Sequence, residues 1–326
     1  MRTARLTSTF TEQTMLRKGP EMLIEPSVQS SLLKDQVAIV TGGSRGIGGA
    51  TSTLLAANGA KVVIAEVDRV KAEEAVAEIN DVYGAGTACA YIADLVEPGA
   101  CDELVSHTLA QYGGLDIVVN NAGYAWDGRV HSMTDEQFQA MLDIHLVVPF
   151  RMARTCAPVF RAAARADAEK GVVRHRKTVM VSSMAGVIGL DGAANYASAK
   201  AGVLGLVRSL AQEWGSMHVN VNAVAFGIIQ TRFAQPQSDR EVIRTGGRTV
   251  HVGIPAKQAA RMGMSIDPDS PPSEAEIYAS RPMPFVSLGR TGTIGEAADA
   301  IFWLCSPLSN YVTGQTIQVN GGTRAG

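Results

Sequence analysis

Short apolar segments alternate with helical segments along most of the chain, from Val37 to the C-terminus. The apolar segments are rich in valine, isoleucine and alanine, which is typical of buried strands. Strands are predicted at 37–41, 61–66, 87–92, 115–123, 177–183, 219–227 and 315–322. Helices are predicted at 50–58, 71–83, 99–112, 134–165, 195–214 and 295–305. This alternation predicts an α/β fold, a Rossmann-like, doubly wound parallel sheet of seven strands in a single domain.

Two parts of the chain break this alternation. Residues 1–33 contain several arginines and many serines and threonines, so we expect a disordered extension before a catalytic domain at 34–326. A transit peptide, or translation that begins at Met15 or Met22, stays open. Residues 232–284 form a proline-rich insertion before the last helix. Long insertions are often binding segments, so we expect a substrate lid; a loop that only packs on the body is the alternative.

The composition is that of an ordinary globular protein, with 46% hydrophobic and 18% charged residues among 326. A net charge of -2 gives no basic surface for nucleic acid or membranes, and no apolar stretch approaches the roughly 18 residues of a membrane helix. The four cysteines lack the spacing of zinc sites or disulfide frameworks. We therefore expect a cytoplasmic protein without a metal, and with neither nucleic acid nor a membrane as a partner.

The first predicted strand is followed by the glycine-rich loop TGGSRGIG (41–48), which leads into a helix. Gly42 permits a tight turn, Gly46 lets the backbone approach a phosphate, and Gly48 allows close packing. A pyrophosphate would lie at the N-terminus of the helix, where free backbone N–H groups point toward it. In this context between a strand and a helix, the loop predicts a dinucleotide site.

Glu66 ends the second predicted strand, 18 residues after Gly48. This is near the spacing at which an acidic residue binds the adenosine ribose hydroxyl. A carboxylate there repels a 2′-phosphate, so NAD is the expected cofactor. Arg45 lies in the glycine loop, where a guanidinium could accept that phosphate, and NADP therefore stays open.

Tyr196 and Lys200 are four residues apart, so their side chains leave the same face of a predicted helix. An ammonium beside a phenol stabilises the phenolate, so we expect Lys200 to lower the pKa of Tyr196 and make it a general acid/base. Ser183 ends a central strand, where ligands bind in such sheets, and its hydroxyl could bond a substrate carbonyl. Taken alone, Tyr196 and Lys200 could be an ordinary surface pair.

Several motifs occur together: TGGSRGIG, Asp94, NNAG (120–123), Ser183, Tyr196-x-x-x-Lys200 and VNAVAFG (221–227). Together they resemble the classical short-chain dehydrogenase/reductase family over nearly all of residues 34–326. The resemblance implies an NAD(P)-dependent oxidoreductase that interconverts a secondary alcohol and a ketone, with Ser183, Tyr196 and Lys200 as catalytic residues. It also implies a homodimer or homotetramer formed through the helices at 134–165 and 195–214 and the C-terminal strand.

The same resemblance implies a set of cofactor contacts. The expected cofactor-binding residues are Gly42, Ser44, Arg45, Gly46, Ile47, Gly48, Glu66, Asp94, Leu95, Asn121, Ala122, Gly123, Tyr196, Lys200, Gly227, Ile229 and Thr231. Asp94 would meet the adenine, and Asn121 would brace the central strands. Lys200 would hold the nicotinamide ribose, and Thr231 would approach the carboxamide.

Two positions depart from the family pattern. His145 occupies the place of a usual asparagine that holds a water in the proton relay. A neutral imidazole can also hold a water, so we name His145 as a candidate catalytic residue; a packed helix residue is the alternative. Phe226-Gly227 replaces a usual Pro-Gly after the sixth strand, but the permissive glycine is retained.

Finer features indicate the branch of the family: the NNAG-x-x-x-D-G arrangement, GLDGAANYASAKAG (189–202) and LGR-x-G (288–292). They look like 3-oxoacyl-thioester reductases and the 3-hydroxyacyl-CoA dehydrogenase domains of multifunctional enzymes, which implies 3-hydroxyacyl and 3-oxoacyl thioesters as substrates. Steroids, sugars, polyols and aromatic alcohols stay open, because one fold serves many substrates. The retained catalytic and glycine-loop residues argue against two rivals, a silent NAD-binding scaffold and a lyase or dehalogenase.

Overall fold

The computed structural model of the chain describes residues 31–232, 242–251, 253, 283 and 285–323. The predicted N-terminal extension, apart from its last three residues, lies outside the described residues, as does most of the predicted insertion at 232–284. Within the described residues, no helix combines the length and the apolar character needed to cross a membrane.

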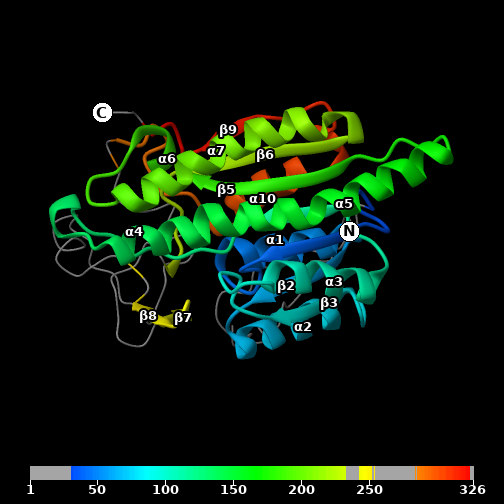
Figure 1. The fold of residues 1–326 in the computed structure, drawn as a ribbon, viewed down its shortest axis with the longest axis horizontal. Coiled ribbons are helices and arrows are strands. Elements are labelled where there is room, and N and C mark those ends of the chain that lie inside the picture. The colour runs from blue at the N-terminus through cyan, green and yellow to red at the C-terminus, as the bar shows by residue number, and fades with distance from the viewer. Residues whose placement is uncertain (1–30, 233–241, 252, 254–282, 284, 324–326) are drawn as a thin grey trace, which may run out of the picture.

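A seven-stranded parallel sheet forms the centre of the molecule, in the order β3-β2-β1-β4-β5-β6-β9 (Figure 1). Its strands are β1 (Val37–Thr41), β2 (Lys61–Glu66), β3 (Ala88–Ile92), β4 (Ile117–Asn120), β5 (Arg176–Ser183), β6 (Val219–Phe226) and β9 (Thr316–Val319). The order reverses between β1 and β4, which pair directly. The crevice outside their carboxyl ends is the place where doubly wound sheets bind ligands. The predicted fold class is therefore confirmed.

Two layers of helices cover the sheet. One face carries α3 (Ala100–Tyr112), α5 (Val148–Glu169) and α7 (Ala194–Trp214). The other face carries α1 (Gly46–Ala57), α2 (Arg69–Tyr83) and α10 (Ile294–Cys305). The predicted helices agree with these bounds within a few residues, except the one at 134–165.

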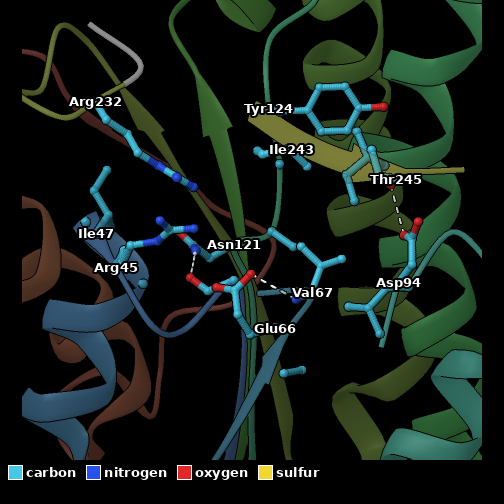
Figure 2. A pocket seen from close by; sticks show the side chains of 18 of the residues that line it. Arg45, Ile47, Glu66, Val67, Asp94, Asn121, Tyr124, Arg232, Ile243 and Thr245 are labelled. Carbon is cyan, nitrogen blue, oxygen red and sulfur yellow. Dashed lines mark hydrogen bonds between the residues drawn. The ribbon is translucent and has the colours of Figure 1, made fainter. Parts of the chain in front are cut away.

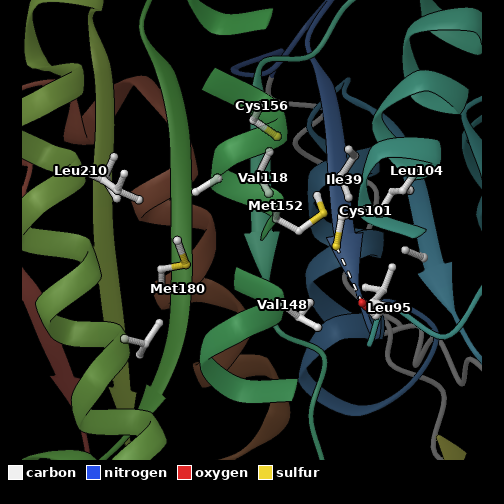
Figure 3. Close-up of a cluster of buried hydrophobic side chains, with 14 of the residues drawn as sticks. Ile39, Leu95, Cys101, Leu104, Val118, Val148, Met152, Cys156, Met180 and Leu210 are labelled. Carbon is white, nitrogen blue, oxygen red and sulfur yellow. Dashed lines mark hydrogen bonds between the residues drawn. The ribbon is translucent and has the colours of Figure 1, made fainter. Parts of the chain in front are cut away.

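The central strand β1 is almost entirely apolar because both of its faces are buried. In β1, Ile39 belongs to the core beneath α3 and α5, whereas Ala38 and Val40 belong to the core beneath α1 and α10. Figure 3 shows the first of these cores, in which Met152 of α5 lies near Ile39. Alternate side chains of a strand point to opposite faces, so a strand between two helical layers has no polar face.

The predicted helix at 134–165 is interrupted, and the prediction of one continuous helix is wrong. α4 (Asp135–Leu142) begins with a capping box in which Thr134 and Gln137 bond each other's backbone N–H groups. A π-helical turn (Asp143–Val147) then precedes α5. Such turns occur often at functional sites, and this one contains His145.

The described part of the insertion includes a two-stranded antiparallel hairpin, β7 (Val242–Thr245) and β8 (Arg248–His251). It is separate from the central sheet and lies on the side of α4 (Figure 1). Arg248 Nε of the hairpin is 2.7 Å from Glu136 Oε1 of α4. Residues 254–282 of the predicted lid lie outside the described residues.

Candidate active site

The glycine loop between β1 and α1 is held in a conformation that side chains would prevent. Gly42 and Gly46 have φ of +59° and +54°, in the left-handed region that glycine favours. A Cβ on Gly48 would lie 2.0 Å from the carbonyl oxygen of Gly42. The loop can therefore fold tightly onto the first turn of α1 only with glycine at position 48.

The ends of β1 and β4 are joined by hydrogen bonds from Asn121. Its Nδ2 donates to the carbonyl oxygens of Thr41 and Gly42, both at 3.0 Å. The hydroxyl of Thr41 accepts the backbone N–H groups of Asn121 and Ala122, again at 3.0 Å each. These bonds hold the glycine loop beside the NNAG segment and keep the crevice between them open.

A pocket occupies this crevice (Figure 2). The predicted cofactor-binding residues that line it are Gly42, Arg45, Gly46, Ile47, Gly48, Glu66, Asp94, Leu95, Asn121, Ala122, Gly123 and Thr231. These residues come from five separate parts of the sequence and meet around one cavity. Their role in binding the cofactor stays a prediction.

The other predicted cofactor residues do not line this pocket. Ser44 donates a hydrogen bond of 2.5 Å to Glu66 Oε2. Gly227 follows β6, and a Cβ there would lie 2.8 Å from Cα of Asn320. Ile229 lines a second pocket, beside an ion pair between Arg290 and Glu296. Tyr196 and Lys200 lie on α7.

Two charged groups relevant to cofactor choice lie at the end of β2. The carboxylate of Glu66 accepts the Ser44 hydroxyl and the backbone N–H of Val67, at 2.9 Å for the latter. Arg45 Nη2 is 3.2 Å from Asp68 Oδ2. The negative charge at Glu66 therefore faces the pocket, while the Arg45 guanidinium is paired with another carboxylate.

Ser183 and Tyr196 meet where β5 ends against α7. A hydrogen bond connects their side chains. The backbone N–H of Ala185 donates to Ser183 Oγ at 3.1 Å, which fixes the serine hydroxyl at the carboxyl edge of the sheet. Burial raises the pKa of Tyr196 to about 12, the Ser183 bond lowers it, and the nearby Asp127 raises it.

Lys200 lies one helical turn from Tyr196, with Nζ 5.7 Å from the centroid of the tyrosine ring. Its Nζ donates a hydrogen bond of 2.6 Å to the carbonyl oxygen of Val181 in β5. Burial lowers the pKa of Lys200 to about 7 because the charged ammonium loses its hydration. The predicted lowering of the Tyr196 pKa by Lys200 is wrong for this structure, because burial dominates at both groups.

His145 is buried next to both residues. Its ring lies edge-on to Tyr196, and its Nε2 is 2.7 Å from the carbonyl oxygen of Tyr124. A carbonyl oxygen only accepts, so Nε2 carries the proton. Burial, together with the charge of Lys200, lowers the pKa of His145 well below its usual value, so the imidazole is neutral. Nδ1 is then a buried acceptor without a hydrogen-bond partner among the described residues.

The short chain dehydrogenase family model matches residues 36–242, and a second model, described as enoyl-(acyl carrier protein) reductase, matches residues 272–324. The protein belongs to the short-chain dehydrogenase family. It is accordingly an oxidoreductase with a nicotinamide cofactor.

Curated relatives of this short-chain dehydrogenase match it over nearly their full length. The 3-oxoacyl-(acyl-carrier-protein) reductase FabG of Escherichia coli (strain K12) is 32% identical over 287 residues, which cover 88% of this chain and 96% of the relative. The enzyme of the same name from Chlamydia muridarum is 32% identical over 293 residues, or 90% and 99% of the two chains. The 3-oxoacyl-(acyl-carrier-protein) reductase of Synechocystis sp. is 32% identical over 292 residues, or 89% and 97%.

Some residues around the pocket of this short-chain dehydrogenase were not predicted from the sequence. Tyr124, Arg232, Ile243 and Thr245 also line the pocket. Asp127 lies near Tyr196, and burial raises the pKa of its carboxyl to about 6. Asp127 belongs to the NNAG-x-x-x-D-G arrangement, so its position carried a signal. No sequence signal indicated Ile243 and Thr245, because they lie in the insertion far from the family motifs.

Proposed function

We propose that the protein reduces 3-oxoacyl thioesters to 3-hydroxyacyl thioesters and prefers NADH as the cofactor. The observation that carries this proposal is the meeting of Ser183, Tyr196 and Lys200 at the carboxyl edge of the sheet, beside the pocket at the glycine loop. The reductases to which the chain is similar are named for 3-oxoacyl-(acyl-carrier-protein) substrates. These names support an acyl thioester as the class of substrate.

The residues of the glycine loop fit a dinucleotide. The absence of a side chain at Gly46, where a Cβ would meet nothing within 4 Å, leaves room for a phosphate close to the backbone. The N-terminus of α1 directs free N–H groups to the same place. When bound, the nicotinamide supplies the hydride. Glu66 would then bind the adenosine ribose hydroxyls, and Thr231 would lie toward the nicotinamide end.

Ser183 and Tyr196 are suited to binding and protonating a carbonyl oxygen. Ser183 Oγ accepts the Ala185 N–H, so its own hydroxyl proton is available for Tyr196 or for a substrate oxygen. With a pKa of about 12, the Tyr196 phenol holds its proton at neutral pH. A protonated tyrosine is a proton donor, which favours the reduction direction.

Lys200 and His145 are suited to supplying the next proton to Tyr196. The pKa of about 7 lets Lys200 exchange a proton near neutral pH. Nδ1 of His145, which has no partner in the part of the chain that the structure describes, can accept a hydrogen bond from a water beside Tyr196 and Lys200. We infer that His145 takes the part that an asparagine usually plays in the family.

The preference for NADH rests on the two charges at the end of β2. The carboxylate of Glu66 would repel a 2′-phosphate at the adenosine ribose. Arg45, the cation of the glycine loop that could accept this phosphate, is paired with Asp68. Both arrangements support NADH over NADPH.

Assembly into a homodimer or homotetramer is part of the proposal. Phe150 of α5 is 47% exposed, although α5 also carries a fully buried face. Exposed aromatic side chains on a long helix are typical of interfaces between subunits.

A titration of the purified protein with NADH and NADPH, followed by turnover of acetoacetyl-CoA, tests the proposed function. Tighter binding of NADH, with oxidation of NADH in the presence of acetoacetyl-CoA, is expected. Tighter binding of NADPH would contradict the role of Glu66. Binding of either cofactor without turnover would contradict the acyl-thioester substrate and would direct the search to other ketones.

A further inference from the structure

We propose that the β7–β8 hairpin is a part of the cofactor site that encloses the adenine, with Ile243 and Thr245 as adenine-side residues and Asp94 as the anchor of the hairpin. This inference rests on the proposed position of the dinucleotide in the pocket. It assigns a cofactor role to a segment within the insertion at 232–284, for which a substrate lid was predicted.

The hairpin is bonded directly to the end of β3 through Asp94. Thr245 Oγ1 donates to Asp94 Oδ1 at 2.9 Å (Figure 2), and the backbone N–H of Gly246 donates to Oδ2 at 2.6 Å. Thr245 is 5% exposed, so its hydroxyl is removed from competing water. Hydrogen bonds to a charged acceptor are stronger than neutral ones, and two of them converge on one carboxylate.

The second strand of the hairpin is held from the other side. Val250 is 3% exposed and belongs to the main hydrophobic core. Arg248 binds Glu136 at the start of α4. The hairpin is therefore held at two places, at Asp94 after β3 and at Glu136 of α4.

Alternation along β7 directs two side chains into the pocket. Ile243 and Thr245 are two residues apart, so they share one face of the strand, and both line the cavity. The same cavity is lined by Val67 and Leu95. An apolar slot with a carboxylate at its edge suits a purine, whose flat faces are apolar and whose exocyclic amino group donates hydrogen bonds.

Asp94 can serve the hairpin and the adenine together. Two carboxylate oxygens offer about four lone-pair positions, and the hairpin donors use two of them. The backbone N–H of Val96 donates to Oδ1 at 3.2 Å and uses a third. One position remains for the amino group. Release of the adenine past Ile243 would then require the hairpin to leave Asp94.

The test compares two threonine-to-valine variants of the hairpin. Thr245→Val removes the hydroxyl that binds Asp94, whereas Thr249→Val removes an exposed hydroxyl on β8 and serves as the matched control. NADH dissociation is measured by stopped-flow fluorescence after mixing with excess NAD. We expect dissociation about tenfold faster for Thr245→Val, with Thr249→Val within about twofold of the unmodified protein.

A second variant and a second ligand show whether the hairpin acts at the adenine end or at the nicotinamide end of the cofactor. Ile243→Ala should weaken NADH binding about tenfold through lost apolar contact, and it decides the matter if Thr245→Val does not fold. ADP-ribose lacks the nicotinamide, so competition by ADP-ribose should weaken by the same factor as NADH binding in both variants.

Three outcomes would overturn the inference. Unchanged dissociation in Thr245→Val and unchanged affinity in Ile243→Ala would show that the hairpin does not contact the cofactor. Tighter NADH binding in Thr245→Val would show that the hairpin competes with the adenine for Asp94. Weaker NADH binding with unchanged ADP-ribose binding would place the hairpin at the nicotinamide end. If the unmodified protein bound neither NADH nor NADPH, the proposed function itself would fail.

Discussion

His145 lies edge-on to Tyr196, with ring centroids 5.0 Å apart and an angle of 87° between the ring planes. The contact places a neutral imidazole, whose Nδ1 has no hydrogen-bond partner among the described residues, against the proposed proton donor. We expect His145→Leu to lower kcat by about a hundredfold, because it fills the space without an acceptor. His145→Asn, which restores a polar amide, should keep most of the activity. An unchanged kcat in His145→Leu would leave His145 as a packed helix residue only.

We expect turnover to require the proton of the Tyr196 phenol. Tyr196→Phe keeps the ring and its contact with His145 but removes the hydroxyl that bonds Ser183. We expect kcat to fall by about a thousandfold or more, with the NADH dissociation constant changed by less than about threefold. Steady-state rates with acetoacetyl-CoA and a fluorescence titration measure the two quantities. A comparable loss of NADH binding would instead indicate a role in holding the cofactor.

Only a glycine at position 123 leaves room for the imidazole of His145. A Cβ at position 123 would lie 2.2 Å from His145 Cε1, so Gly123→Ala must displace the imidazole. We expect a loss of roughly 1–3 kcal/mol in the free energy of unfolding, together with a lower kcat.

Gly205 of α7 is the matched control for Gly123. A Cβ on Gly205 would meet nothing within 4 Å, so Gly205→Ala should leave kcat unchanged and stabilise the helix by about 0.5–1 kcal/mol. Denaturant unfolding and steady-state rates distinguish the two variants. Equal effects at both positions would contradict the packing argument.

Glu66 selects the cofactor if its charge faces the adenosine ribose. Glu66→Gln keeps the shape of the side chain but removes the charge, so the ratio of NADH to NADPH affinity should fall about tenfold or more. Glu78→Gln, an exposed change on α2, removes one negative charge elsewhere and should leave the ratio unchanged. Parallel titrations with both cofactors provide the comparison. If the ratio of NADH to NADPH affinity changed equally in both variants, the change would reflect the net charge of the protein alone.

Lys177 is a buried amine, 2% exposed, that donates hydrogen bonds to the neutral side chains of Asn220, Ser309 and Asn310. Burial lowers its pKa from 10.5 to about 8. Between these values the unfolded chain holds the proton that the folded chain has released, so the free energy of unfolding rises with pH. The resulting increase in the free energy of unfolding is roughly 3 kcal/mol at most.

The comparison of the unmodified protein with Lys177→Met isolates this effect. Urea unfolding at about pH 7 and about pH 10 gives a stability difference at each pH, and other titrating groups cancel in the comparison. The free energy of unfolding of the unmodified protein, relative to that of Lys177→Met, should be larger at the higher pH. A difference that does not change with pH would show that Lys177 retains its ordinary pKa.

The strands and helices of the fold were predicted within a few residues because they depend on local periodicity. β1 and β4 are buried along their whole length, and a strand buried on both faces is encoded by a nearly continuous apolar run. The continuous helix predicted at 134–165 was wrong because the π-turn at Asp143–Val147 does not disturb that periodicity. Helical spacing of apolar residues continues on both sides of the turn.

The sequence by itself determined the order of the βαβ units, the glycine loop and the shared helical face of Tyr196 and Lys200, since each depends on neighbours in the chain. The tertiary structure decided the direction of the Tyr196 pKa and the bond between Thr245 and Asp94, which joins residues 151 positions apart. Burial and long-range contacts arise only when distant segments pack together. A local sequence pattern therefore predicts neither how deeply the Tyr196 phenol is buried nor which residues bond the Asp94 carboxylate.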